Sequence, residues 1–260
     1  MVVPSPFIRS TAKTIAPYVT SNQIIVNVSK GIEESTLMTL TEVICDEIKG
    51  ATVAVLSGPS HAEEVGKEMP TTVVAGASTK EIAELVQDTF MSDFFRVYTS
   101  PDVVGIELGG ALKNVIALAA GISDGLGCGD NAKAAIITRG IAEISRLGCA
   151  LGGQETTFSG LSGIGDLIVT CASKHSRNRN AGFLMGQGKT YKEALEEVKM
   201  VVEGVYSAKA ALKLSEKYNI EMPIVKTVNQ ILFHDLSAKE AMVMLLTRMK
   251  TAEDKDLLWK

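Results

Sequence analysis

The pattern of apolar and polar positions changes near residue 100. Before it, apolar β-branched runs typical of buried strands occur at residues 24–29, 52–57, 71–76 and 94–99. Helical patterns lie between these runs, at residues 36–49, 60–67 and 79–90. Strands that alternate with helices predict βαβ units. The expected fold class is therefore α/β, with a partial Rossmann-like, doubly wound parallel sheet followed by an all-α helical domain.

Helical patterns dominate the chain after Pro101. The predicted helices cover residues 102–122, 131–149, 178–187, 190–197, 204–218 and 238–250. We expect two domains: residues 1–99 form the C-terminal part of a dinucleotide-binding domain, and residues 100–260 form a substrate-binding and catalytic domain. The last ten residues, TAEDKDLLWK, are expected to form a solvated tail.

The first residues, MVVPS, are typical of a strand end that leads directly into a helix. No Gly-x-Gly-x-x-Gly follows a strand in these 260 residues, and the glycine-dense segments 125–130 and 160–166 lie among helices. We therefore expect the glycine-rich first βαβ unit of a dinucleotide-binding domain to be missing from these residues. We also expect residues 1–260 alone to have negligible dehydrogenase activity.

Composition and charge narrow the classes of function. Hydrophobic residues make up 46% of the chain and charged residues 22%, which is typical of a soluble globular protein. No uninterrupted apolar run approaches the roughly 18 residues of a membrane span, and residues 1–30 show no basic n-region followed by an apolar h-region. A net charge of −4 argues against a nucleic-acid partner. Four scattered cysteines without a Cys-x-x-Cys pair predict reduced thiols, no metal site and a cytoplasmic protein.

Two loops after predicted strands carry polar candidates. Lys30 follows the first strand, and the second leads into LSGPSHAEE, in which Ser60 could cap a helix with Glu63 at the capping-box position. Ligands of open α/β sheets bind beyond the carboxyl ends of the strands. These loops therefore favour a binding site, although simple helix capping by Ser60 and an exposed loop lysine remain open alternatives.

The segment GGALKNV, at residues 109–115, places two glycines in a buried helical pattern. Each glycine weakens a helix by about 1 kcal/mol relative to alanine. Because side chains on a helix tilt toward its N-terminus, Lys113 is expected to lie over Gly109 and Gly110. The missing side chains would let a flat ligand approach beneath the lysine. A close helix crossing, with the lysine extending to solvent, is the alternative.

The segment CASKHSRNRNAG, at residues 171–182, concentrates positive charge in an acidic protein. Ser176 and Asn178 could cap the helix that follows, and a helix N-terminus together with Arg177 suits a phosphate. Upstream, Asp166 follows a glycine turn, where its carboxylate could orient a lysine or cap a helix. A solvated basic loop is the plain alternative for the segment.

Seven segments follow one another along the chain: SKG, LSGPSHAEEV, ELGGALKNVIALAAGISDGLG, NAKAAIITRGIAEISRLG, GLSGIGDLIVTCASKHSRNRNAG, VVEGVYSAKA and EMPIVKTVNQIL. In this order they resemble the bacterial NAD(P)-dependent glycerol-3-phosphate dehydrogenases. The resemblance implies an N-terminal dinucleotide-binding domain and a helical substrate domain. It also implies interconversion of sn-glycerol 3-phosphate and dihydroxyacetone phosphate with NAD or NADP, a reaction that supplies phospholipid synthesis.

The resemblance also implies roles for individual residues. Lys113 would be the proton donor and acceptor at the reacting carbon. Substrate would be bound by Lys30, Gly58, Ser60, Lys113, Asp166, Ser176, Arg177 and Asn178. The cofactor would be bound by Lys30, Ala62, Arg177, Val201 and Glu203.

The expected proton transfer depends on the pKa of Lys113. A free lysine, with a pKa of about 10.4, is a poor base near neutrality. Burial and the charge of Lys30 would lower this pKa, whereas Asp166 would raise it. The sequence leaves that balance open.

Two other functions compete with this interpretation. β-Hydroxyacid and sugar-phosphate dehydrogenases also use a lysine on a long helix, but usually with Asn or Gln four residues later, where this chain has Ala117. The second competing interpretation is a non-catalytic fragment that dimerises or binds phosphate. Neither a choice between NAD and NADP nor an oligomeric state, a homodimer included, follows from the sequence. The partners expected are the small-molecule substrate, with no nucleic acid and no stable membrane insertion.

Overall fold

The sheet of the computed structural model has four strands, and the structure describes residues 1–250, 252 and 253. The strands are β1 (Ile24–Asn27), β2 (Thr52–Ser57), β3 (Thr71–Gly76) and β4 (Phe95–Ser100), in the order β1-β2-β3-β4. Each lies within two residues of its predicted range. The expected tail lies mostly outside the described residues.

One pair of neighbouring strands departs from the parallel pattern. β1 pairs with β2, and β3 with β4, in parallel, but β2 and β3 are antiparallel, with Val55 opposite Gly76. Only the short helix α3 (Ala62–Val65) separates β2 from β3. A parallel connection usually crosses over through a full helix, and a helix of four residues is too short to return the chain to the starting end of the sheet. The sheet is therefore mixed, though mostly parallel.

Helices cover both faces of this sheet, as the α/β prediction requires. The helices of this part are α1 (Ile8–Ile15), α2 (Leu40–Glu47) and α4 (Lys80–Phe90), with η1 (Ser5–Phe7) and η2 (Ala16–Tyr18) flanking α1. Side chains alternate between the faces of a strand. Ile25 accordingly packs with α1 and α2, whereas Ala54 packs with α4. The sheet is sandwiched in the doubly wound manner.

The first residues run beside β1 without forming a strand. The Met1 amino group donates to the carbonyl of Val26 over 2.7 Å, and the amide of Val28 donates to the carbonyl of Met1 over 3.1 Å. These bonds extend the pattern of the sheet edge, and η1 and α1 follow directly. The predicted helix after MVVPS is confirmed, whereas the predicted strand end is not formed as a strand.

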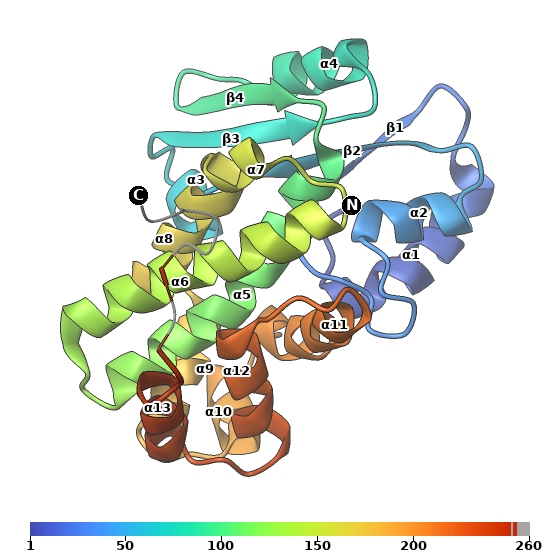
Figure 1. Cartoon of the computed structure of the whole chain (residues 1–260). Helices are drawn as coiled ribbons and strands as arrows, with labels where there is room; N and C mark the ends of the chain where they lie inside the picture. The colour runs from blue at the N-terminus through green and yellow to red at the C-terminus, as the bar shows by residue number, and fades with distance from the viewer. Residues whose placement is uncertain (251, 254–260) are drawn as a thin grey trace, which may run out of the picture.

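The rest of the described chain is helical. Its helices are α5 (Val103–Gly125), α6 (Gly129–Ala150), α7 (Glu155–Phe158), α8 (Asp166–Ala172), α9 (Arg177–Gly186), α10 (Tyr191–Val198), α11 (Glu203–Lys217), α12 (Pro223–Phe233) and α13 (Ala238–Leu246), and the π-helical turn η3 (Leu161–Gly165) precedes α8. Figure 1 shows α5 running from the sheet into the middle of the helical part. The division into domains at residues 99 and 100 stays a prediction.

α5 is the central element of the larger hydrophobic core. It is long and apolar enough to cross a membrane, but 89% of its most apolar window is buried inside the protein. This corrects the expectation that no segment approaches a membrane span. The few charged residues of α5 interrupt its apolar runs, so a search for uninterrupted runs does not find this helix. Its burial is that of a core helix.

The contact between α5 and α9 is unusually close. A Cβ on Gly121 would lie within 2.0 Å of the Arg179 carbonyl oxygen, and one on Gly182 within 2.2 Å of the Leu118 carbonyl oxygen. Glycines on both helices therefore let the two backbones touch. The ion pair between Arg179 and Asp124, 2.6 Å apart, fixes the same crossing. This packing holds the N-terminus of α9 beside the middle of α5.

Candidate active site

Lys113 lies in the buried middle of α5 and is directed toward α8. Its ammonium donates to Oδ1 of Asp166 over 2.5 Å and to Oγ1 of Thr170 over 2.7 Å. Lys113 is 5% exposed and Asp166 1% exposed. The predicted alternative in which this lysine extends to solvent is wrong.

Lys30 reaches the same carboxylate from the sheet. Its ammonium donates to Oδ2 of Asp166 over 2.6 Å and to the carbonyl of Gly58 over 2.9 Å. Because β1 and β2 are parallel, the loops that follow them meet, and Lys30 and Gly58 lie side by side. Lys113, Lys30 and Asp166 are hereafter called the lysine–aspartate cluster.

The electrostatics of the cluster answer the question that the sequence left open. Burial lowers the pKa of Lys113, and Lys30 lowers it further, so that it falls to about 8 despite the opposing charge of Asp166. Burial alone would raise the pKa of Asp166, but the two ammonium groups outweigh it and lower that pKa. The site thus holds an ionised carboxylate beside a lysine that can exchange a proton near neutral pH.

Each ammonium keeps one donor for a ligand. A lysine has three N–H groups, and the described residues accept two from Lys113 and two from Lys30. Thr170 donates its own hydroxyl hydrogen to the backbone carbonyl of Asp166 over 2.6 Å, so its lone pairs face Lys113. Sequence reasoning missed Thr170, and its place one helical turn after Asp166 is the only signal that could have found it.

The neighbouring glycines Gly109 and Gly110 of α5 serve different contacts. A Cβ on Gly109 would lie 2.6 Å from the backbone oxygen of Ser162 in η3, so this glycine admits the turn that carries Asp166. The expectation that Gly109 leaves space for a ligand is wrong. A Cβ on Gly110 would lie 3.1 Å from Oγ of Ser57 and 3.4 Å from Cγ of Lys30. Gly110 therefore makes room for the stem of Lys30.

The loop after β2 corrects the predicted helix cap. α3 begins at Ala62, its N-cap residue is His61, and no side chain caps it. Ser60 instead donates to the carbonyl of Gly58 over 3.1 Å. The loop turns at Gly58, with φ of +144°, and a Cβ there would lie 3.0 Å from Cα of Val73. This backbone leaves Ser60 one residue before the N-cap position and keeps it beside Gly58, which binds Lys30.

Ser176 and Arg177 lie at the N-terminus of α9, as the sequence suggested. Ser176 caps α9 by accepting from the amide of Arg179 over 3.2 Å. Arg177 is exposed, and its guanidinium has no hydrogen-bond or ion-pair partner among the described residues. A helix N-terminus beside an uncommitted guanidinium can bind a phosphate.

Asn178 does not cap α9, contrary to the prediction. It lies within the first turn, where its amide donates to Oδ1 of Asn114 over 2.9 Å and accepts from the amide of Gly204 over 2.8 Å. These bonds link α9 to the residue next to Lys113 and to the start of α11. One N–H of Asn178 remains for a ligand.

Glu203 joins the start of α11 to the turn η1 near the N-terminus. Its carboxylate accepts from the amide of Ser5 over 2.9 Å and from the Ser5 hydroxyl over 2.5 Å. Burial raises the pKa of Glu203, while Ser5 and the charge of Arg177 oppose that rise. Val201 lies two residues before it, and Ala62 is exposed at the start of α3. Neither joins the hydrogen bonds that connect the other predicted residues.

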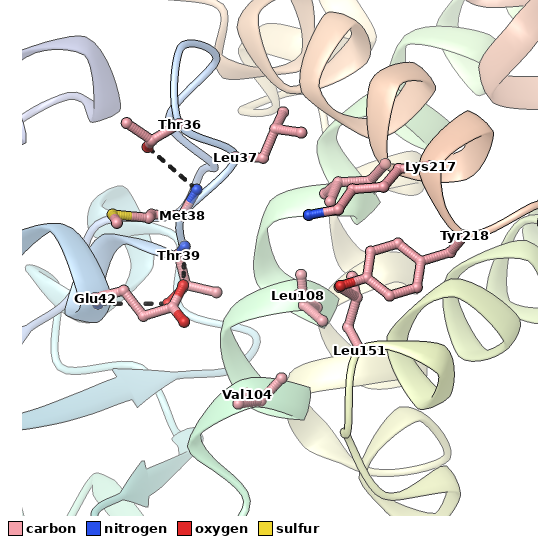
Figure 2. Close-up of a pocket in the computed structure, with 11 residues that line it drawn as sticks. Thr36, Leu37, Met38, Thr39, Glu42, Val104, Leu108, Leu151, Lys217 and Tyr218 are labelled. Carbon is pink, nitrogen blue, oxygen red and sulfur yellow. Dashed lines mark hydrogen bonds between the residues drawn. The ribbon is translucent and has the colours of Figure 1, made fainter.

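A cavity of about 220 Å³ lies elsewhere, between the loop before α2, α5 and α11. Figure 2 shows its apolar floor, with Tyr218 and Lys217 on one side and Glu42 on the other. None of the predicted site residues lines it. The candidate site is therefore the lysine–aspartate cluster with the start of α9, not this cavity.

Comparisons with known proteins agree with this arrangement. Residues 1–83 match the model of the N-terminal part of NAD-dependent glycerol-3-phosphate dehydrogenase, and residues 102–243 match that of its C-terminal part. The chain belongs to this family. The family resemblance inferred from the sequence is confirmed.

Relatives of this glycerol-3-phosphate dehydrogenase family align along the whole chain. The glycerol-3-phosphate dehydrogenase (NAD(P)+) of Agathobacter rectalis is 64% identical over 260 residues, which are 100% of this chain and 77% of the relative. That of Bacillus subtilis is 52% identical over 261 residues, covering 99% of this chain and 76% of the relative. A crystal structure of glycerol-3-phosphate dehydrogenase from Coxiella burnetii superposes with a TM-score of 0.91 at 38% identity, over 95% of this chain and 75% of that one.

Proposed function

We propose that this chain carries the catalytic residues of an NAD(P)-dependent dehydrogenase that interconverts sn-glycerol 3-phosphate and dihydroxyacetone phosphate, with Lys113 as the proton-transfer group. The observation that carries the role of Lys113 is its burial against Asp166 with a pKa lowered to about 8. A lysine in this condition can both donate and accept a proton in the physiological range. Family membership supplies the reaction.

The residues present fit the nicotinamide cofactor that the family uses. Arg177 is an uncommitted cation, and its charge reaches the fixed carboxylate of Glu203. Arg177 and Glu203, together with Lys30, Ala62 and Val201, would hold the cofactor at the carboxyl ends of β1 and β2. When bound, NADH or NADPH supplies the hydride.

The protein's own part in the reaction is orientation and proton transfer. We propose that the third N–H of Lys113 donates a hydrogen bond to the reacting oxygen of the substrate. Lys113 transfers this proton to the oxygen as the ketone is reduced. Asp166 holds the ammonium in place, and Thr170 and Lys30 complete the fixed geometry. In the oxidation direction, neutral Lys113 takes the proton from the alcohol.

The remaining substrate-binding residues hold the phosphate and the backbone of the substrate. We place the phosphate at the start of α9, against Arg177 and near Ser176 and Asn178. Gly58 and Ser60 line the opposite side beside Lys30. Binding energy from the phosphate, remote from the reacting carbon, positions that carbon under Lys113.

NADH- or NADPH-dependent reduction tests this function in the full-length enzyme. We expect rapid oxidation of the reduced cofactor with dihydroxyacetone phosphate and loss of turnover in Lys113→Met. Thr170→Val should retain binding with a lower kcat, because it removes only a partner of Lys113. A wild-type enzyme that prefers a 3-hydroxyacid or a sugar phosphate, or a Lys113→Met variant with full activity, would contradict the proposal.

We also propose a cytoplasmic enzyme without stable membrane insertion that supplies phospholipid synthesis. The support is that its relatives are dehydrogenases of small molecules and that its most apolar helix is buried in the core. A homodimer is the proposed assembly. Sedimentation velocity at several protein concentrations tests the assembly, and fractionation of cell lysate tests the compartment.

A further inference from the structure

Ser5 is a buried polar residue of η1 to which the proposed reaction gives no role. Both of its donors bind the carboxylate of Glu203: the backbone N–H reaches Oε1 over 2.9 Å, and the hydroxyl reaches Oε2 over 2.5 Å. Within the part of the chain that the structure describes, these are the hydrogen bonds to that carboxylate. One serine therefore fixes both oxygens of a residue that we assign to cofactor binding.

Helix capping does not account for the position of this carboxylate. α11 begins at Glu203, and the amide of the next residue, Gly204, is bound by the side chain of Asn178 over 2.8 Å. The carboxylate is bound instead by a residue 198 positions earlier in the chain. The contact between Ser5 and Glu203 therefore joins the sheet to the helical part of the protein.

This contact lies beside the lysine–aspartate cluster. A Cβ on Gly31, the residue after Lys30, would lie 2.8 Å from Oγ of Ser5 and 3.5 Å from Oε2 of Glu203. The missing side chain at Gly31 thus lets Ser5 and the carboxylate approach the carboxyl end of β1. This is the end of the strand at which we propose that the cofactor binds.

Ser5 prepares the carboxylate as a hydrogen-bond acceptor. Burial raises the pKa of Glu203, whereas the two donors of Ser5 and the charge of Arg177 lower it, so Ser5 favours the ionised form. A carboxylate has about four lone-pair sites, and Ser5 occupies one on each oxygen. Glu203 is only partly buried, so a ligand can reach it. Fixing the side chain beforehand removes its ordering entropy from the cost of binding.

We propose that Ser5 is a positioning residue for cofactor binding, which holds the Glu203 carboxylate in place to accept a hydrogen bond from NADH or NADPH. The cofactor carries suitable donors in its ribose hydroxyls and in the N–H groups of its carboxamide. The inference rests on the proposed function, because that function supplies the cofactor.

Fluorescence titration of the full-length enzyme with NADH and with NADPH measures the cofactor Kd without turnover. Ser5→Ala removes the hydroxyl donor, Glu203→Ala removes the carboxylate, and the double variant completes a double-mutant cycle. Ser29→Ala is the matched control. The Ser29 hydroxyl donates to the carbonyl of Val3 over 2.6 Å, so it anchors the same N-terminal segment without binding Glu203.

We expect Ser5→Ala to weaken binding of the preferred cofactor about three- to tenfold, the range of one hydrogen bond's net contribution. Glu203→Ala should weaken it at least as much, and the double variant no further, because Ser5 acts through that carboxylate. Ser29→Ala should bind the cofactor within about twofold of the wild type. In turnover, Ser5→Ala should raise the KM for the cofactor and keep kcat within about twofold.

Additive losses of affinity in the cycle, or an equal loss in Ser29→Ala, would show that Ser5 only anchors the N-terminal segment. Wild-type affinity in Ser5→Ala or in Glu203→Ala would show that this contact does not serve the cofactor. Each of these results overturns the inference and leaves the proposed function intact. A wild type that binds neither NADH nor NADPH contradicts the proposed function itself, and the inference falls with it.

Discussion

The ammonium of Lys113 and the carboxylate of Asp166 form a buried ion pair, with 2.5 Å between Nζ and Oδ1. The pair joins α5 to α8, and the second oxygen of Asp166 binds Lys30 from the sheet. One carboxylate therefore fixes two lysines that come from parts of the chain more than eighty residues apart. Its charge keeps a proton on Lys113, and burial keeps that proton exchangeable.

Alanine at the two neighbouring glycines of α5 should have opposite effects on stability. In Gly109→Ala the new methyl would meet the Ser162 carbonyl oxygen at 2.6 Å, and backbone cannot move aside cheaply. We expect a loss of about 1–3 kcal/mol in the free energy of unfolding. Gly165→Ala, whose nearest neighbour would be 3.6 Å away, is the matched control in the facing turn. Urea denaturation of both variants measures the difference, and equal stabilities would refute the assigned contact.

Gly110→Ala should instead keep the fold and reduce activity. The nearest neighbours of its methyl would be the side chains of Ser57 and Lys30, which can shift, and alanine favours a helix by up to about 1 kcal/mol. Displacing Lys30 should lower kcat/KM by roughly tenfold, equivalent to about 1.4 kcal/mol. A melting curve and a measurement of kcat/KM on this variant test both expectations. A lower melting temperature with unchanged specific activity of the folded enzyme would show that Gly110 serves packing alone.

Arg177→Ala should weaken recognition of the phosphate specifically. Because its guanidinium has no protein partner among the described residues, its loss should cost the phosphorylated substrate about 1.5–3 kcal/mol. Unphosphorylated dihydroxyacetone should lose far less. Lys174→Ala removes an exposed cation from the same segment and should affect neither strongly. Equal losses of kcat/KM on the two substrates would show that Arg177 does not bind the phosphate.

Glu143 should make stability depend on pH. This α6 carboxylate accepts from the amides of Ile224 and Val225 at the start of α12, and burial raises its pKa from 4.5 to about 7 despite those bonds. The folded state then binds more protons than the unfolded state between these values, so this group lowers the free energy of unfolding as pH rises from about 4.5 to 7.

Glu143→Gln keeps an oxygen acceptor and removes the charge. We expect the difference in the free energy of unfolding, variant minus wild type, to be more favourable to the variant at pH 7.5 than at pH 5. Urea denaturation at the two pH values measures this difference. Glu196→Gln, on an exposed carboxylate, is the control and should show a smaller change. A wild type and a Glu143→Gln variant with parallel pH dependence would contradict the raised pKa.

The sequence predicted the elements well but not every direction or contact. The strands and most helices follow from apolar periodicity, because burial on one face sets that pattern. The antiparallel pairing of β2 and β3 does not, since alternation is the same in both directions. α12 was not predicted, and the start of α3 was placed too early because Ser60 has the residue type of a helix cap without the backbone position.

In the candidate site, the sequence predicted which residues take part but not which side chains contact one another. Lys30, Lys113 and Asp166 could be named because strand ends and the family motifs mark them. Their mutual contact, and the hydrogen bond from Lys113 to Thr170, depend on how α8 packs against α5. The Gly109 contact with Ser162 likewise joins residues that are distant in sequence, so local pattern alone could suggest only that the glycine admits a close neighbour.

The most direct test of the lysine–aspartate cluster is the pH profile of kcat/KM for reduction of dihydroxyacetone phosphate. Reduction needs protonated Lys113, so kcat/KM should fall as pH rises through about 8, the pKa that burial sets for this lysine. Asp166→Asn removes the charge that holds the proton and should move this fall to lower pH, whereas Lys30→Met removes a repelling charge and should move it to higher pH. Opposite shifts in the two variants are the predicted result; shifts in the same direction, or a fall that stays in place, would contradict the assignment of Lys113 as the proton donor.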